Sequence, residues 1–202
     1  MMVIGLTGKA AAGKNVVADA FSTLGCEVVD VDLLGHSVLE QNQDLLQKSF
    51  GKDIVREGRV DRRALGSLVF SDPEKLHLLE AITHPAMVEA CKRLIEEAKS
   101  AQKPALVINA ALLYRMGLYT LCDHVVFVKA PCLVRFLRSR KREHITLAKF
   151  LSRERAQQDV RKEVFPSSLP VFSLSNGSDR VLIHRQVTTY CATIGIGVSS
   201  VR

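Results

Sequence analysis

A glycine-containing loop stands directly between a short apolar run and a helical pattern near the start of the chain. Residues 8–14 read GKAAAGK and match the pattern G-x-x-x-x-G-K. The run Val3–Thr7 before the loop is typical of a buried strand, and Lys14–Leu24 after it carries apolar residues at helical spacing. Glycines let such a loop turn tightly, and a helix N-terminus favours negative charge at the same place. The pattern therefore predicts a phosphate-binding loop, with a plain strand-to-helix turn as the alternative.

Apolar runs of strand length recur along the chain and alternate with helical stretches. After the first run they are Cys26–Val31, Ala105–Ile108, Val125–Val128 and Val171–Leu174. The segments between them are long enough for crossover helices, so this order predicts a parallel sheet with helices on both faces. We expect a three-layer α/β fold around a central parallel sheet of about five strands.

Length and composition favour one domain that contains an insertion. The chain has 202 residues, of which 47% are hydrophobic and 24% charged, as in an ordinary globular protein. The stretch from about 33 to 103 is too long for one crossover, so we expect a helical insert that holds a second substrate. Residues 1–202 then form a single domain, with this insert and a lid segment at about 138–165.

Several signals bear on the cellular compartment. No apolar run reaches the roughly 18 residues of a membrane span, and the N-terminus lacks the features of a signal peptide. The five cysteines are widely spaced and contain no C-x-x-C pair, which favours reduced thiols over disulfides or a zinc site. We therefore expect a cytoplasmic protein with no membrane partner.

Positive charge is concentrated in one segment. Residues 135–162 hold ten Lys or Arg and three acidic residues, and their net charge of +7 equals that of the whole chain. Such a segment indicates a polyanionic partner, either nucleic acid or a phosphorylated small molecule. Because Phe136 and Phe150 are its only aromatic residues, it lacks a base-stacking platform, and we expect no nucleic-acid partner. Beyond Ile145 it shows little apolar periodicity, which predicts a solvated, mobile cover.

Three polar side chains near the loop and the second strand have catalytic potential. If the second strand ends in VDVD, alternation places Asp30 and Asp32 on one face, at the strand end where α/β sheets bind ligands. A carboxylate there could take a proton from an attacking hydroxyl, and the alternative is an N-cap of the next helix. Asn15 follows Lys14 where the motif has Ser or Thr, and its amide oxygen is a suitable Mg²⁺ ligand. The alternative for Asn15 is a loss of metal binding.

The order and spacing of these motifs resemble the dephospho-coenzyme A kinase family over nearly the whole chain. The stretches that carry the resemblance are Ile4–Gly8 with the loop, Val28–Asp32, Asp61–Leu65, Val69–Pro73, Ile82–Pro85, Leu112–Leu113, Gly117–Tyr119, Asp123–Val128, Arg138, Arg142, Gln157 and Ser175–Ser178. The resemblance implies a kinase that uses ATP and Mg²⁺ to phosphorylate the ribose 3′-hydroxyl of dephospho-coenzyme A.

The resemblance also implies roles for individual residues. Asp32 maps to the catalytic base, while Lys14 and the paired arginines Arg138 and Arg142 would stabilise the transferring phosphoryl group. For each arginine the alternative is a solvated helix face, and for the His84-Pro85 pair it is a helix boundary. The expected ATP contacts are Gly8, Ala11, Ala12, Gly13, Lys14, Asn15 and Val16; Mg²⁺ is assigned to Asn15, and the acceptor to Asp32 and His84.

Some positions depart from the family pattern. The family loop GGIGSGKS has glycines where this chain has Lys9 and Ala11, and the acidic residue of its PLLFE motif is here Arg115. The segment Leu169–Ser173 also lacks the family's acidic residue. These departures leave two alternatives open: a degenerate nucleotide-binding relative without turnover, or a kinase for another nucleotide-like acceptor. The oligomeric state is open, with a monomer favoured.

Overall fold

The computed structural model describes residues 1–177 and 179–196, which form alternating strands and helices. The elements in chain order are β1 (Met2–Thr7), α1 (Lys14–Thr23), β2 (Glu27–Asp30), α2 (Val31–Gln41), α3 (Gln43–Phe50), the 3₁₀ helix η1 (Lys52–Ile54), β3 (Val55–Arg56), β4 (Arg59–Val60), α4 (Arg62–Phe70), α5 (Pro73–Ser100), β5 (Ala105–Asn109), η2 (Leu118–Leu121), β6 (His124–Lys129), α6 (Cys132–Glu143), α7 (Leu147–Ala156), η3 (Lys162–Val164), β7 (Val171–Ser175) and α8 (Arg180–Thr193).

A five-stranded sheet with the order β2-β5-β1-β6-β7 forms the centre of the first structural unit, which comprises residues 1–29 and the chain from residue 94 onward. Strand β1 pairs in parallel with β5 on one side and with β6 on the other, and β6 pairs in parallel with β7. The expected parallel α/β sheet of about five strands is confirmed. All five strands lie within two residues of the ranges that the apolar runs predict.

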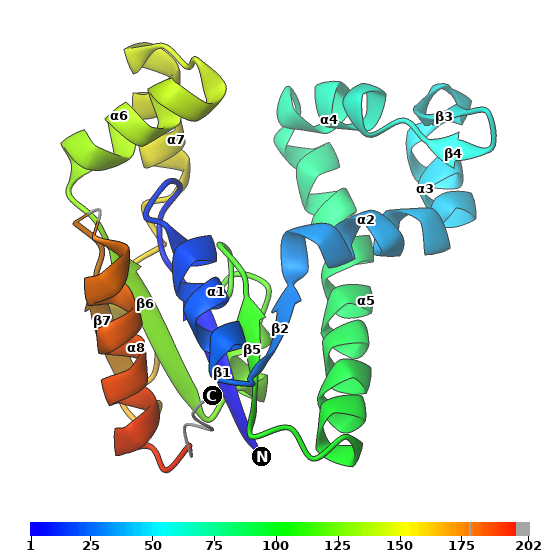
Figure 1. Cartoon of the computed structure of the whole chain (residues 1–202). Helices are drawn as coiled ribbons and strands as arrows, with labels where there is room; N and C mark the ends of the chain where they lie inside the picture. Colours follow the sequence, from blue (N-terminus) through cyan, green and yellow to red (C-terminus); the bar gives the residue numbers. More distant parts are fainter. Residues whose placement is uncertain (178, 197–202) are drawn as a thin grey trace. The chain divides into compact units, whose positions relative to one another are not determined.

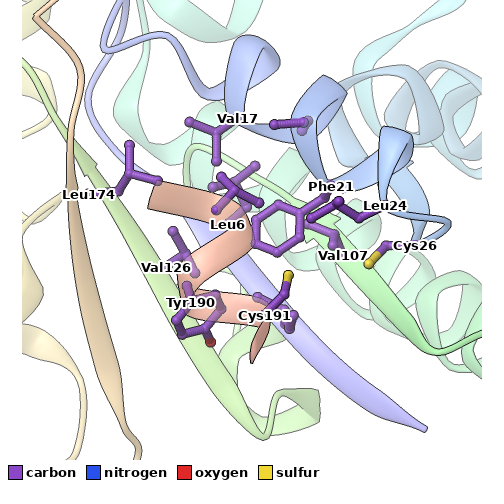
Figure 2. Close-up of a cluster of buried hydrophobic side chains, with 14 of the residues drawn as sticks. Leu6, Val17, Phe21, Leu24, Cys26, Val107, Val126, Leu174, Tyr190 and Cys191 are labelled. Atoms are coloured by element: carbon purple, nitrogen blue, oxygen red, sulfur yellow. The ribbon is translucent and has the colours of Figure 1, made fainter. Parts of the chain in front are cut away.

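Helices α1 and α8 lie side by side over one face of this sheet (Figure 1). Their buried side chains meet those of the strands in one apolar cluster, in which Phe21 and Tyr190 make an edge-to-face contact at 6.2 Å (Figure 2). Ile4 and Leu6 of β1 point into this cluster, while Gly5 between them faces Leu113 on the opposite face. The sheet is therefore covered on both faces, which gives the three layers expected.

The second structural unit comprises Asp30–Arg93 and has its own small core. Five buried side chains form that core: Leu46, Ile54, Val60, Leu65 and Val69. The unit is mostly helical, but it also contains the two-stranded antiparallel hairpin β3–β4, which the sequence patterns did not indicate. Its bounds differ from the insert expected at about 33–103, because α5 runs from this unit into the first one.

One local prediction and one of the alternatives are wrong. The chain leaves β2 at Asp30 and turns into α2, so Asp32 lies in the first turn of a helix and not on a strand. His84-Pro85 is no helix boundary, since α5 continues through Pro85 over 28 residues. The segment beyond Ile145 forms the helix α7, which is exposed over most of its length and buries Phe150.

The cysteines differ sharply in exposure. All five are free thiols in the described part of the chain; Cys26, Cys91 and Cys191 are buried, Cys122 is half-buried, and Cys132 is exposed at the start of α6. None of the helices in the described residues is long and apolar enough to cross a membrane.

Candidate active site

The loop between β1 and α1 depends on two glycines that no larger residue could replace. Gly8 has a φ of 152°, and a Cβ atom there would lie 2.5 Å from the carbonyl oxygen of Val128 on the neighbouring strand. Gly13 has a φ of 93°, and its Cβ would lie 2.0 Å from the side-chain nitrogen of Asn176. Both glycines of the sequence motif are therefore required by backbone conformation and by close packing.

Ala11 takes a conformation that usually belongs to glycine. Its φ is 59°, in the left-handed region, and it occupies one of the two positions where the family pattern has glycine. An L-residue pays about 1–2 kcal/mol for that conformation. Ala11 thus takes the backbone conformation of a glycine, and its presence at this position strains the loop locally.

The N-terminus of α1 is prepared for an anion. Gly13 is its N-cap residue, with no side-chain cap among the described residues and no acidic residue in the first turn. No side chain among the described residues therefore competes for the start of this helix, and the helix dipole adds positive potential there. Lys14 folds back over the loop, with its Nζ atom 3.3 Å from the Gly8 carbonyl oxygen. A helix N-terminus with an ammonium group close by is the combination of groups that favours an anion.

Arg138 of α6 forms hydrogen bonds with the backbone of the phosphate loop. Its Nη1 atom donates to the carbonyl oxygens of Ala11 and Ala12, both at 3.3 Å. Its Nη2 atom donates at 2.9 Å to the side-chain oxygen of Asn176, whose own amide nitrogen donates to the Ala12 carbonyl at 2.9 Å. Asn176 is buried, and it lies directly after β7. Arg138 and Asn176 thus brace the backbone of the phosphate loop.

The second expected arginine has different surroundings. The guanidinium group of Arg142 pairs with Glu143 on the same helix, and 66% of its side chain is exposed. The structure therefore brings Arg138 to the loop but leaves Arg142 on the surface of α6. Arg115 also has a partner: it forms a two-pronged ion pair with Asp159, at 2.8 and 3.0 Å.

Two asparagines meet beside the loop and suit a magnesium ion. Asn15 is exposed in the first turn of α1, and its side-chain oxygen lies 3.5 Å from the amide nitrogen of Asn109 at the end of β5. The Asn109 side-chain oxygen is buried and has no hydrogen-bond partner among the described residues. Neutral amide oxygens are hard ligands of the kind that Mg²⁺ accepts, with water completing its shell. The donor set therefore fits the ion.

In the second structural unit, Asp30 and Asp32 have different surroundings. The Asp30 side chain accepts hydrogen bonds from the backbone N–H groups of Asp32 and Leu33, at 3.0 and 3.3 Å, and so caps α2. This is the alternative that the sequence left open for Asp30. Asp32 follows in the first helical turn with an exposed side chain, and the half-buried His84 lies within α5 of the same unit.

Sequence reasoning missed several residues at this site. Asn109 gave no signal beyond its place at the end of an apolar run, where parallel sheets carry functional side chains. Arg135 and Glu154 were only members of a charged segment, although they meet beside the loop. Of the expected stretch 175–178, Asn176 is in place and Ser178 lies outside the described residues. The described residues contain no cluster of three His, Cys, Asp or Glu side chains that could hold a metal.

The sheet order, the phosphate loop and its bracing arginine define a P-loop kinase of a small molecule. Solved structures share this fold: a shikimate kinase from Acinetobacter baumannii superposes with a TM-score of 0.53 at 12% identity, over 96% of this chain and 93% of that one. The protein TT1252 from Thermus thermophilus is more similar, with a TM-score of 0.78, 31% identity, and 96% and 97% of the two chains covered.

Sequence comparison identifies the family within this class. The family profile described as dephospho-CoA kinase matches residues 2–169, so the chain belongs to the dephospho-CoA kinase family. The dephospho-CoA kinase of Latilactobacillus sakei is 35% identical over 163 residues, which cover 79% of this chain and 81% of that protein. The enzyme of the same name from Bacillus licheniformis is 37% identical over the same shares. The expected family, fold class and enzyme class are confirmed.

Proposed function

We propose that this chain catalyses the reaction of its family, in which ATP phosphorylates the ribose 3′-hydroxyl of dephospho-CoA to give CoA and ADP. The observation that carries the proposal is the intact phosphate loop, with its glycines, its lysine and an uncapped helix N-terminus, in a chain of this family. The degenerate binding relative is not favoured, since the loop keeps its geometry despite Lys9 and Ala11. The free cysteines fit a reducing compartment, and we place the reaction in the cytoplasm.

Phosphoryl transfer needs positive groups around the transferring phosphate and a positioned nucleophile. In our proposal the N–H groups of the loop and Lys14 bind the β- and γ-phosphates, and ATP contacts the residues assigned from the sequence, from Gly8 to Val16. Arg138 fixes the loop backbone, while the exposed Arg142 is available to the phosphoryl group when substrates bind. Its present partner is the adjacent, exposed Glu143, and a surface ion pair of this kind costs little to break.

Mg²⁺ fits the pair of amide oxygens beside the loop. We propose that Asn15 and Asn109 hold it, directly or through water. The ion, when bound, would neutralise charge on the β- and γ-phosphate oxygens. The unpartnered oxygen of Asn109 supports this assignment, because a buried polar atom without a partner otherwise costs about 1–3 kcal/mol.

The acceptor hydroxyl needs a base, and Asp32 is the proposed one. Its exposed carboxylate is not engaged as a helix cap, since Asp30 performs that task. His84 is the proposed acceptor contact in the same structural unit. Its half-buried position on α5 leaves part of the imidazole accessible to a substrate.

A coupled assay of ADP release tests the function. ADP release should depend on both Mg-ATP and dephospho-CoA, and mass spectrometry should find a product heavier by one phosphate at the 3′ position. Asp32→Asn should lower kcat by about 10²-fold or more while ATP binding persists. Asp30→Asn is the matched control, because Asn caps a helix as well as Asp does and activity should remain. ADP release without an acceptor requirement would contradict the proposal.

A further inference from the structure

Two side chains of α7 reach the phosphate loop. Glu154 lies 3.4 Å from the Nζ atom of Lys9, the second residue of the loop. Gln157, the C-cap residue of α7, accepts a hydrogen bond from the backbone N–H of Ala10 at 2.8 Å. Because residues three apart share a helix face, a single face of α7 makes both contacts. The lid segment is thus joined to consecutive residues of the loop by one ion pair and one hydrogen bond.

Glu154 also holds the first turn of α6. Its carboxylate accepts from both terminal nitrogens of Arg135, one of them at 2.7 Å, in a two-pronged ion pair. The Arg135 side chain is only 7% exposed and that of Glu154 17% exposed. Arg135 is fixed further by a hydrogen bond from its Nε atom to the Ala130 carbonyl oxygen, at 3.2 Å, and its guanidinium carbon lies 5.8 Å from the centre of the Phe150 ring.

The three charges form one chain, Lys9–Glu154–Arg135, with the carboxylate in the middle. The hydrogen bonds from Arg135 hold the pKa of Glu154 below its ordinary value, so the carboxylate is charged at neutral pH. Nearly buried Arg135 depends on that charge, since an unpaired charge there would be costly. Lys9 is 30% exposed and stands where the family pattern has glycine, so its side chain adds a link that the pattern does not contain.

We propose that Lys9 and Glu154 are positioning residues whose ion pair holds the lid segment against the phosphate loop of this kinase. We call this ion pair the clasp. The proposal rests on the function proposed above. The clasp orders the loop around the triphosphate and keeps α7 over it, so that the lid excludes water from the transferring phosphoryl group. Weakening this contact should weaken ATP binding and raise the rate of ATP hydrolysis without an acceptor. The rate of the chemical step with a bound acceptor should change little.

The variant Lys9→Met tests the clasp, because it removes the link to the loop and leaves the Arg135–Glu154 pair intact. We expect the KM for ATP and the ratio of acceptor-independent to acceptor-dependent ADP release each to rise about fivefold. Lys9→Arg should restore both values. Lys103→Met is a matched control, since Lys103 also forms an ion pair at 3.4 Å, with Glu27, outside the site; it should leave both values unchanged.

Hydrogen exchange provides a readout independent of turnover. In Lys9→Met the amides of α7 should exchange faster than in the native chain. In Glu154→Gln the amides of α6 should also exchange faster, because Arg135 loses its partner. The clasp would be overturned if Lys9→Met kept the native exchange rates, the native KM for ATP and the native ratio of acceptor-independent to acceptor-dependent ADP release. If instead the native chain makes no CoA while exchange in Lys9→Met still rises, the proposed function fails and the contact between lid and loop stands.

Discussion

At the residue scale, the tightest packing of the site lies between Gly13 and Asn176. Gly13→Ala combines an unfavourable φ with a contact of 2.0 Å to a buried side chain that itself holds the loop. We expect this variant to lose more than about 2 kcal/mol of unfolding free energy and to bind ATP at least about tenfold more weakly. Thermal unfolding and ATP titration measure the two effects.

The variant Gly25→Ala separates the effect of the unfavourable φ from the effect of close packing. Gly25 also has a positive φ, 83°, but a Cβ there would meet nothing within 4 Å. It should cost only the conformational strain of about 1–2 kcal/mol and leave ATP affinity unchanged. If both variants lose the same stability and both bind ATP normally, the close packing of Gly13 on Asn176 is unimportant.

Arg138 and Arg142 of α6 provide a second residue-scale prediction. Arg142→Ala should lower kcat by about 10²-fold with little change in melting temperature, because the ion pair that it loses with Glu143 lies on the surface and contributes little to stability. Arg138→Ala should lower both stability and ATP affinity, since it removes the donors to two loop carbonyls and to Asn176. Native turnover in Arg142→Ala would make that arginine part of a solvated helix face.

At the element scale, apolar periodicity predicted where the sheet strands lie but not how each one ends. The alternation of VDVD is compatible with a strand, yet the Asp30 carboxylate captures two backbone N–H groups and starts α2 at once. The capping contacts of Asp30 span only two and three residues, so alternation alone could not distinguish the end of a strand from the start of a helix. The rule for proline also fails to predict where a helix ends. Proline usually ends a helix at the residue before it, yet α5 continues through Pro85.

Helices α6 and α7 provide an element-scale prediction about pH. Arg135 lowers the pKa of Glu154, and Arg153 together with Arg142 lowers that of Glu143. A carboxyl whose folded pKa is depressed stabilises the fold above its ordinary pKa of about 4.5, and this stabilisation is lost as the pH falls through the folded pKa. The lid segment should therefore loosen only in acid, below about pH 4.5.

Carbon-13 NMR of the glutamate carboxyl groups measures this directly. The Glu154 signal should titrate with a midpoint below 4.5, and the ring signals of Phe150 should broaden over the same range. A Glu154 midpoint at or above 4.5 would contradict the role of Arg135.

At the scale of the whole molecule, the two structural units have separate cores. Leu46 and Leu174 are both fully buried, the first in the core of the second unit and the second in that of the first. Leu46→Ala and Leu174→Ala should each cost about 2–5 kcal/mol. We expect Leu46→Ala to lower CoA formation while ATP affinity persists, and Leu174→Ala to lower both. Equal loss of ATP affinity in the two variants would show that the units fold as one.

The sequence predicted the unit that contains the phosphate loop better than the other unit. The G-x-x-x-x-G-K loop and the apolar runs are local signals, so the phosphate loop and a parallel sheet of about five strands could be predicted, whereas the order of the strands in the sheet could not. The ion-pair chain through Arg135 and the partner of Arg115 could not be foreseen, because each joins residues at least 19 positions apart and no local pattern shows which charges meet. The hairpin β3–β4 has strands of two residues, too short for any periodicity to appear.

The uneven exposure of the cysteines has a practical consequence. Cys132 is the exposed thiol among them, and it stands at the start of α6, the helix that carries Arg135, Arg138 and Arg142. A maleimide fluorophore should therefore react there first, with the buried thiols protected in the native fold. The natural chain already carries the attachment point for an optical reporter of lid closure, so nucleotide-driven motion can be followed by fluorescence without engineering a new thiol.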